Sequence, residues 1–172
     1  MLRLVTQNDL AELRFSAFRN PRLRMNYNIH DSYDDACQRF LNAVGYNSYI
    51  QPHKHPSIPH LETLVSISGR LLVILFSDCG KISEVKILSN SASTDGNPIV
   101  SIPSNIFHTV LALDQYSILF ECKAGPFKEH EGKIHPSWAP EPDTEDAFQY
   151  LKNLKIRAGK FLNLSAAPKD EP

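Results

Sequence analysis

The order of apolar and polar residues in this 172-residue chain changes twice. From residue 46 to about residue 127, short runs rich in Val, Ile, Leu, Tyr and Phe alternate with Pro, Gly, Asn and Asp, which is typical of strands joined by turns. The predicted strands lie near residues 46–53, 61–67, 70–77, 82–88, 98–102, 107–113 and 116–123. No helical pattern separates them, whereas a parallel sheet needs crossover connections. The pattern therefore predicts a mainly β protein with an antiparallel sandwich or barrel.

Helical spacing characterises the segment before this region. Thr6 and Asp9 form a capping-box pattern, and apolar residues follow at helical spacing until the Asn-Pro pair at residues 20–21. Ser32 and Asp35 form a second such pattern. The apolar stripe after it consists of Tyr33, Ala36, Cys37, Phe40, Leu41 and Val44. We therefore expect two N-terminal helices that pack on the barrel.

A third helical pattern follows a proline-rich return to the body of the protein. Residues 128–172 contain this return, a helix capped by Asp143 or Thr144, and a tail. The expected apolar face of the helix consists of Ala147, Phe148, Leu151 and Leu154. Together with the N-terminal segment 1–45 and the barrel 46–127, this region is expected to form one structural domain.

Charge and hydropathy exclude two classes of partner. Eighteen Lys and Arg against 19 Asp and Glu give a formal net charge of -1, so no bulk positive field attracts nucleic acid or an anionic membrane. The longest apolar run, residues 71–76, is far shorter than a membrane span. The N-terminus lacks the pattern of a secretory signal. We therefore expect a cytoplasmic protein with a local small-molecule site.

The three cysteines indicate reduced thiols. Cys37, Cys79 and Cys122 are an odd number at spacings of 42 and 43 residues, which suits neither a disulfide framework nor a zinc ribbon.

Three histidines and one glutamate have the composition of a metal site. His53 and His55 at i and i+2 in an extended stretch project from the same face. Glu62 from a neighbouring strand and His108 from a distant one can converge with them inside a barrel. The alternative is two surface histidines, an exposed carboxylate and a core histidine. An inward Glu62 without a cation would cost several kcal/mol, however.

These residues stand in a longer motif. In order along the chain, the motif consists of His53, His55, Glu62, Gly69, Pro103, Asn105 and His108. It resembles the two motifs of the cupin superfamily, a small β-barrel of jelly-roll type that holds a metal with three His and one Glu. Six residues separate the second histidine from the glutamate, where the superfamily usually has three or four, and this leaves His60 as an alternative ligand. Asn105 replaces the usual Gly and tolerates the same left-handed backbone.

A narrower resemblance covers residues 4 to 141. The segments PRLRMNYNIH, QPHKHP, SGRLLVILF, IPSNIFHTVLAL, FECKAGPF and SWAPE follow one another in the chain. In this order they are similar to the WbuC-type cupin-fold metalloproteins, often encoded in bacterial O-antigen and lipopolysaccharide gene clusters. The resemblance implies a cupin barrel with a metal site, and it implies no settled reaction.

The N-terminal segment supplies candidate ligand-binding groups. Arg22, Arg24, Asn26 and Asn28 offer guanidinium and amide donors for a ligand's carboxylate, phosphate or hydroxyl groups. Nearby, Tyr27 and His30 are candidates for the catalytic acid or base. The alternative is a polar linker whose arginines extend to solvent.

The donor set limits the function classes. Three neutral imidazoles and one carboxylate around one divalent Fe, Mn, Ni or Zn ion leave a net charge of about +1, which favours an anionic or enolisable ligand. We expect a metal-dependent isomerase or epimerase that acts on a sugar or nucleotide-sugar-like anion in O-antigen or lipopolysaccharide metabolism. The alternatives are an iron-dependent oxygenase and a non-catalytic sugar-binding or regulatory module. A homodimer would cover the strand edge near residues 46–50.

Overall fold

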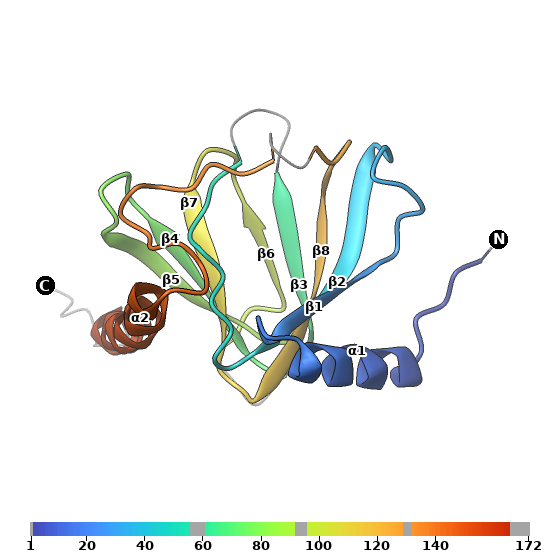
Figure 1. Ribbon diagram of the computed structural model, residues 1–172, viewed down its shortest axis with the longest axis horizontal. Coiled ribbons are helices and arrows are strands. Elements are labelled where there is room, and N and C mark those ends of the chain that lie inside the picture. Colours follow the sequence, from blue (N-terminus) through green and yellow to red (C-terminus); the bar gives the residue numbers. More distant parts are fainter. Residues whose placement is uncertain (1, 56–60, 92–95, 129–131, 166–172) are drawn as a thin grey trace, which may run out of the picture.

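Two antiparallel sheets form the body of the protein (Figure 1). The computed structural model describes residues 2–55, 61–91, 96–128 and 132–165. The five-stranded sheet has the order β1-β2-β8-β3-β6 and the three-stranded sheet has the order β5-β4-β7. The strands are β1 (Arg24–Asn28), β2 (Cys37–Gly45), β3 (Glu62–Ser68), β4 (Leu71–Phe76), β5 (Ile82–Leu88), β6 (Ile99–Ile102), β7 (Phe107–Ala112) and β8 (Tyr116–Ala124). The predicted antiparallel β fold is confirmed.

A hydrophobic core joins the two sheets. Its buried members are Val44, Leu64, Leu71, Val73, Leu88, Ile102, Val110, Ala112 and Leu119. Among the connections at which the chain passes between the sheets are β3–β4 and β7–β8. Arg70 and Asp114 in these two connections form an ion pair of 2.6 Å between Nη2 and Oδ1. The crossings are thereby tied to each other.

Helix α1 (Gln7–Arg19) begins where the sequence predicts it. The Thr6 side chain accepts a hydrogen bond from the Asp9 backbone, and the Asp9 carboxylate accepts one from the Thr6 backbone. The helix covers the outer face of the five-stranded sheet, where its buried residues share one cluster with those of β2 and β8. That cluster consists of Leu10, Leu13, Ala17, Leu41, Ala43 and Ile118.

The second predicted N-terminal helix is wrong, because its residues form strand β2, Cys37–Gly45. Phe40, Leu41 and Val44 fit both a helical and an alternating pattern, so periodicity alone could not separate the two. In the structure β2 lies between β1 and β8 and pairs with both along its length. Hydrogen bonds to two neighbours and burial of alternate residues override the local preference.

The predicted strand at 46–53 is also wrong. This segment is a turn followed by extended chain that ends in one isolated bridge between His53 and His108. The edges of the five-stranded sheet are β1 and β6, so the strand edge on which the expected dimer contact rested does not exist.

Helix α2 (Glu145–Ser165) packs against the three-stranded sheet on the side of the molecule opposite α1 (Figure 1). Thr144 caps it, accepting a hydrogen bond from the Ala147 backbone at 3.1 Å. Leu151 and Leu154 are buried as expected, whereas Phe148 is 59% exposed and does not belong to the apolar face. Within the described residues no helix is long and apolar enough to cross a membrane.

Candidate metal centre

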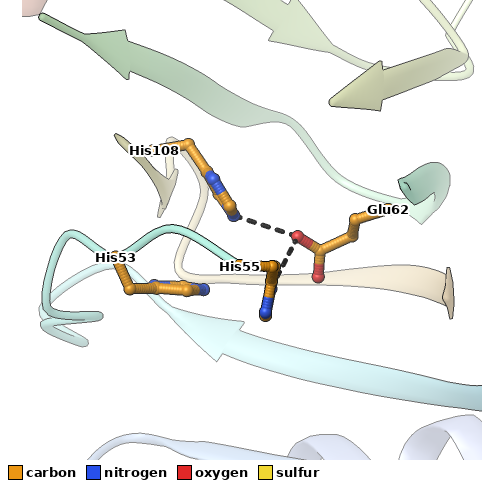
Figure 2. A group of neighbouring side chains, drawn as sticks. All are labelled: His53, His55, Glu62 and His108. Carbon is orange, nitrogen blue, oxygen red and sulfur yellow. Dashed lines mark ion pairs between the residues drawn. The ribbon is translucent and has the colours of Figure 1, made fainter. Parts of the chain in front are cut away.

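Three separate parts of the chain bring the four predicted metal-ligating side chains together. His53 and His55 lie in the extended segment after β2, Glu62 begins β3, and His108 is the second residue of β7. Their ligand atoms all lie within 4.8 Å of one another (Figure 2). Each of the four residues is at most 6% exposed. The group can therefore hold one metal ion inside the barrel.

Backbone pairing fixes the spacing of these residues. The amide of His53 donates to the carbonyl of His108 at 3.0 Å, and the amide of His108 donates back at 2.8 Å. Asn105 lies in the left-handed region with φ 64°, as expected for a residue at a turn glycine position. Its amide donates to the carbonyl of His55 at 2.9 Å. The two sequence motifs are thus joined by hydrogen bonds before any side chain contributes.

The three imidazole rings all direct Nε2 toward the same point. In each ring Nδ1 lies against a backbone carbonyl, which assigns the proton to Nδ1 and leaves a lone pair on Nε2. The acceptors are the carbonyl oxygens of Gln51 for His53 (3.0 Å), Gly132 for His55, and Ile106 for His108 (2.9 Å). Because neutral imidazole is the form that binds metal, the rings are prepared for ligation.

The Glu62 carboxylate faces these lone pairs. Its Oε2 lies 2.9 Å from Nε2 of His108 and 3.6 Å from Nε2 of His55. Among the described residues, Glu62 Oε2 and His55 Nε2 are buried without a hydrogen-bond partner. Acceptor atoms that face one another in a buried site are costly unless a cation lies between them. Their arrangement therefore fits a divalent metal ion.

The surroundings keep the ligands in the required protonation states. Burial lowers the pKa of His53 far below its usual range, and Lys133 and His108 lower it further. Burial alone would raise the pKa of Glu62, but the polar side chains around its carboxylate outweigh burial and hold this pKa well below the usual range. At neutral pH His53 is thus neutral and Glu62 is ionised.

A cavity of about 610 Å³ adjoins the metal centre. All four residues predicted to bind a ligand line it, and His30 lines it with them: Arg22, Arg24, Asn26, Asn28 and His30. A smaller pocket of about 40 Å³ contains His53, Glu62 and His108. The two spaces share Asn42, Glu121 and Lys133 in their walls. A ligand in the cavity can therefore extend toward the metal centre.

The two candidates for proton transfer lie in different places. His30 is 5% exposed and lines the cavity, and its Nε2 is buried without a partner among the described residues. Tyr27 packs on the opposite face of β1, in the cluster under α1, with the Arg3 guanidinium 5.7 Å above its ring. Because neighbours along a strand point to opposite faces, the structure separates Tyr27 from the site.

Three charged residues of this site were not predicted from the sequence. Glu121 and Lys123 lie on the inner face of β8, and Lys133 lies in the return segment. Glu121 and Lys123 could have been identified from the sequence, because they are charged residues at i and i+2 in an otherwise apolar strand. Burial and the nearby Glu62 charge raise the pKa of Glu121 to about 8. Loss of solvation and the cation of Lys123 lower the pKa of Lys133.

Other predicted features have different outcomes. His60, the alternative ligand, lies outside the described residues. The three cysteines are free thiols, as expected, and the Sγ atoms of Cys37 and Cys122 are 3.5 Å apart on the outer face of the sheet.

Comparisons with known proteins agree with this fold. A family model described as a domain of unknown function, DUF6016, matches residues 5–88. No curated protein matches this sequence. The structure is similar to that of protein SO0799 from Shewanella oneidensis, with 9% identity, a TM-score of 0.53, and coverage of 64% of this chain and 72% of that one.

Two further solved structures are also similar. The first is a cupin 2 conserved barrel domain protein from Rhodopseudomonas palustris, with 12% identity, a TM-score of 0.49, and coverage of 80% of this chain and 78% of that one. The second is a cupin-2 domain containing protein from Shewanella frigidimarina, with 16% identity, a TM-score of 0.48, and coverage of 71% and 95%. The present protein thus combines two facing antiparallel sheets with a buried group that can hold a divalent metal.

Proposed function

We propose that the protein is a metal-dependent isomerase or epimerase that acts on a sugar or nucleotide-sugar-like anion in O-antigen or lipopolysaccharide metabolism. The observation that carries this proposal is the convergence of three Nε2 lone pairs and one carboxylate beside a cavity of about 610 Å³. The WbuC-type sequence resemblance supports the biological setting. A cavity of this size is typical of small-molecule sites.

The metal would be held by His53, His55, Glu62 and His108. When bound, a divalent ion supplies Lewis acidity toward hydroxyl or carbonyl oxygens and so lowers the barrier to proton transfer at the neighbouring carbon. Four protein ligands leave open positions on Fe, Mn or Ni, which take six ligands, but not on tetrahedral Zn. Catalysis at this site therefore favours Fe, Mn or Ni over Zn.

The strand β1 would position the ligand. Arg24 is fixed by hydrogen bonds from its Nη1 to the Tyr49 carbonyl at 2.6 Å and to Ser48 Oγ at 3.4 Å. Asn26 Nδ2 donates to Asn28 Oδ1 at 2.8 Å, which orients both amides. Side chains held in this way lose little freedom when a ligand binds. They would bind its hydroxyl and anionic groups.

His30 would transfer the proton. Its Nδ1 lies 2.9 Å from the Arg39 carbonyl and 3.1 Å from the Arg39 amide, which fixes the ring. The opposite atom, Nε2, belongs to a cavity-lining residue and has no partner among the described residues. A buried nitrogen without a partner can accept or donate a proton to a bound ligand.

The test begins with the metal content of the purified protein. We expect about one divalent ion per chain, and a melting temperature that rises when Fe, Mn or Ni is added to metal-free protein. A protein that stays free of metal and whose melting temperature ignores divalent ions would overturn the proposal.

Turnover is then followed by exchange of carbon-bound hydrogen in D2O with candidate nucleotide sugars. His30→Gln should abolish exchange while ligand-dependent stabilisation remains. Tyr27→Phe is the control, because the other candidate for proton transfer packs on the opposite face of β1, in the cluster under α1. Undiminished exchange in His30→Gln would remove His30 from the mechanism.

A further inference from the structure

Lys133 lies at the junction between the metal centre and the large cavity. It lines the pocket that contains His53, Glu62 and His108, and it also lines the cavity of about 610 Å³. The residue as a whole is exposed, but its charged end lies among these groups and has lost solvation. A ligand that reaches the metal centre from the cavity therefore passes Lys133.

The Lys133 ammonium also has no direct ion-pair partner among the described residues, although the carboxylates of Glu121 and Glu62 lie near it. Lys123, the other lysine of the cavity, forms an ion pair with Glu121, with 2.8 Å between Nζ and Oε1. Within the described part of the chain, Lys133 forms no ion pair or side-chain hydrogen bond. A cation held among groups that leave it unpaired is a binding group for an anion.

The cavity concentrates positive charge. Four cationic side chains and one carboxylate line it within the described residues: Arg22, Arg24, Lys123, Lys133 and Glu121. The whole chain has a formal net charge of -1. A site so different from the rest of the protein attracts anionic ligands.

The two spaces differ in size. The pocket at the metal centre has a volume of about 40 Å³, and one water needs about 10–15 Å³ of such space, so the pocket admits about three or four oxygen atoms. The body of a ligand must therefore remain in the larger cavity. The ligand group next to the metal-facing oxygen then lies at the junction, where Lys133 is.

We propose that Lys133 binds the carboxylate of a ligand whose neighbouring hydroxyl or carbonyl oxygen faces the four metal ligands. The ligand class is a sugar acid with an α-hydroxy or α-keto carboxylate. This inference rests on the proposed metal site and narrows the proposed sugar anion to one chemistry. An ammonium and a metal ion on neighbouring oxygens would hold both ends of such a group.

The experiment measures ligand affinity of Ni-loaded protein by isothermal titration calorimetry. D-Gluconate is the probe, D-glucose lacks the carboxylate, and D-glucose 6-phosphate carries its anionic group at the other end. Wild-type protein should bind D-gluconate more tightly than both. Lys133→Met should weaken D-gluconate binding by about tenfold or more, as expected for loss of a hydrogen bond to a charged group.

Two control variants accompany this measurement. Lys152→Met makes the same change on the exposed face of α2, and its D-gluconate affinity should match wild type. Lys133→Arg keeps the charge and should restore most of the affinity. The metal content must be the same in all variants. With equal metal content, a loss of D-gluconate affinity reflects the loss of the lysine and not a loss of bound metal.

Three results would overturn the assignment of Lys133. One is Ni-loaded Lys133→Met that binds D-gluconate within twofold of wild type. Another is wild-type protein that binds D-glucose 6-phosphate or D-glucose as tightly as D-gluconate. The third is Ni-loaded wild-type protein that does not bind D-gluconate. Failure to load Ni at all would instead contradict the proposed function.

Discussion

The two faces of the five-stranded sheet have opposite compositions. The outer face contributes Leu41, Ala43 and Ile118 to a dry cluster under α1. Away from the core cluster, the inner face presents Asn42, Glu121 and other polar side chains to the cavity. Residues that are adjacent in sequence thus belong to regions with different roles, since alternate side chains of a strand point to opposite faces.

This difference separates stability from function within single strands. Apolar burial on the outer face stabilises the fold. The inner face instead keeps polar atoms that have no partner in the described part of the chain, such as Asn42 Oδ1, and such atoms lower stability. Such a cost is typical of sites that bind ligands. Substitutions on the two faces should therefore have separable effects.

The largest effect is expected at the metal centre. Glu62→Gln removes the only negative charge of the four ligands and should lower metal affinity by more than about 100-fold, because even changes to groups that support ligands cost about 10- to 100-fold. Metal content after dialysis measures this loss of affinity. Asp78→Asn, an exposed acid-to-amide control outside the site, should retain metal. Full metal content in Glu62→Gln would show that the carboxylate is not a ligand.

The largest effect on folding is expected on the outer face. Ile118 is fully buried, and Ile118→Ala should lower the free energy of unfolding by about 2–5 kcal/mol because it leaves a cavity. Urea denaturation at equilibrium measures this loss. Metal affinity of the folded variant should not change, and a marked drop would show that the two faces are coupled.

A substitution on the inner face should weaken ligand binding and leave the stability of the fold nearly unchanged. Asn42 Oδ1 is buried without a partner among the described residues, so Asn42→Leu should keep the free energy of unfolding within about 1 kcal/mol of wild type. Ligand binding should weaken, because Asn42 lines both the cavity and the metal pocket. Asn153→Leu on the exposed face of α2 is the control. A large loss of stability in Asn42→Leu would contradict the functional assignment of this face.

The smallest effect is expected at the crossings between the sheets. Hydrogen bonds from Arg70 hold the pKa of Asp114 below its usual range, so the folded state binds the proton less tightly than the unfolded state. The pair therefore stabilises the fold above the unfolded pKa of about 4 and loses this contribution as the pH falls further. Both side chains are about one-third exposed or more, which limits the effect to about 1 kcal/mol or less.

The measurement compares wild type with Asp114→Asn by urea denaturation at several pH values. The variant should be less stable at pH 7, and the difference should shrink as the pH falls below about 4. A difference that is the same at pH 7 and pH 3 would show that the ion pair does not contribute.

Local signals predicted part of this fold well. The Thr6 capping box and the alternating strands from residue 61 onward depend on nearby residues, and the structure has α1 and β3 to β8 there. The apolar residues around Phe40 fit both a helical and an alternating pattern. They form a strand because this segment pairs with β1 and β8. Lys133 carried no local signal, because its role depends on the segments that fold around it.

Residue types and spacing, together with the resemblance to the cupin motifs, predicted the donor set: histidines two apart, a glutamate that precedes a turn, and a histidine after Asn105. The tertiary structure decided which face of each strand lines the cavity, and so it joined His30 to the site and excluded Tyr27. The physical reason is that ligand chemistry belongs to individual side chains, whereas the inside and outside of a sheet exist only after its strands have paired and curved.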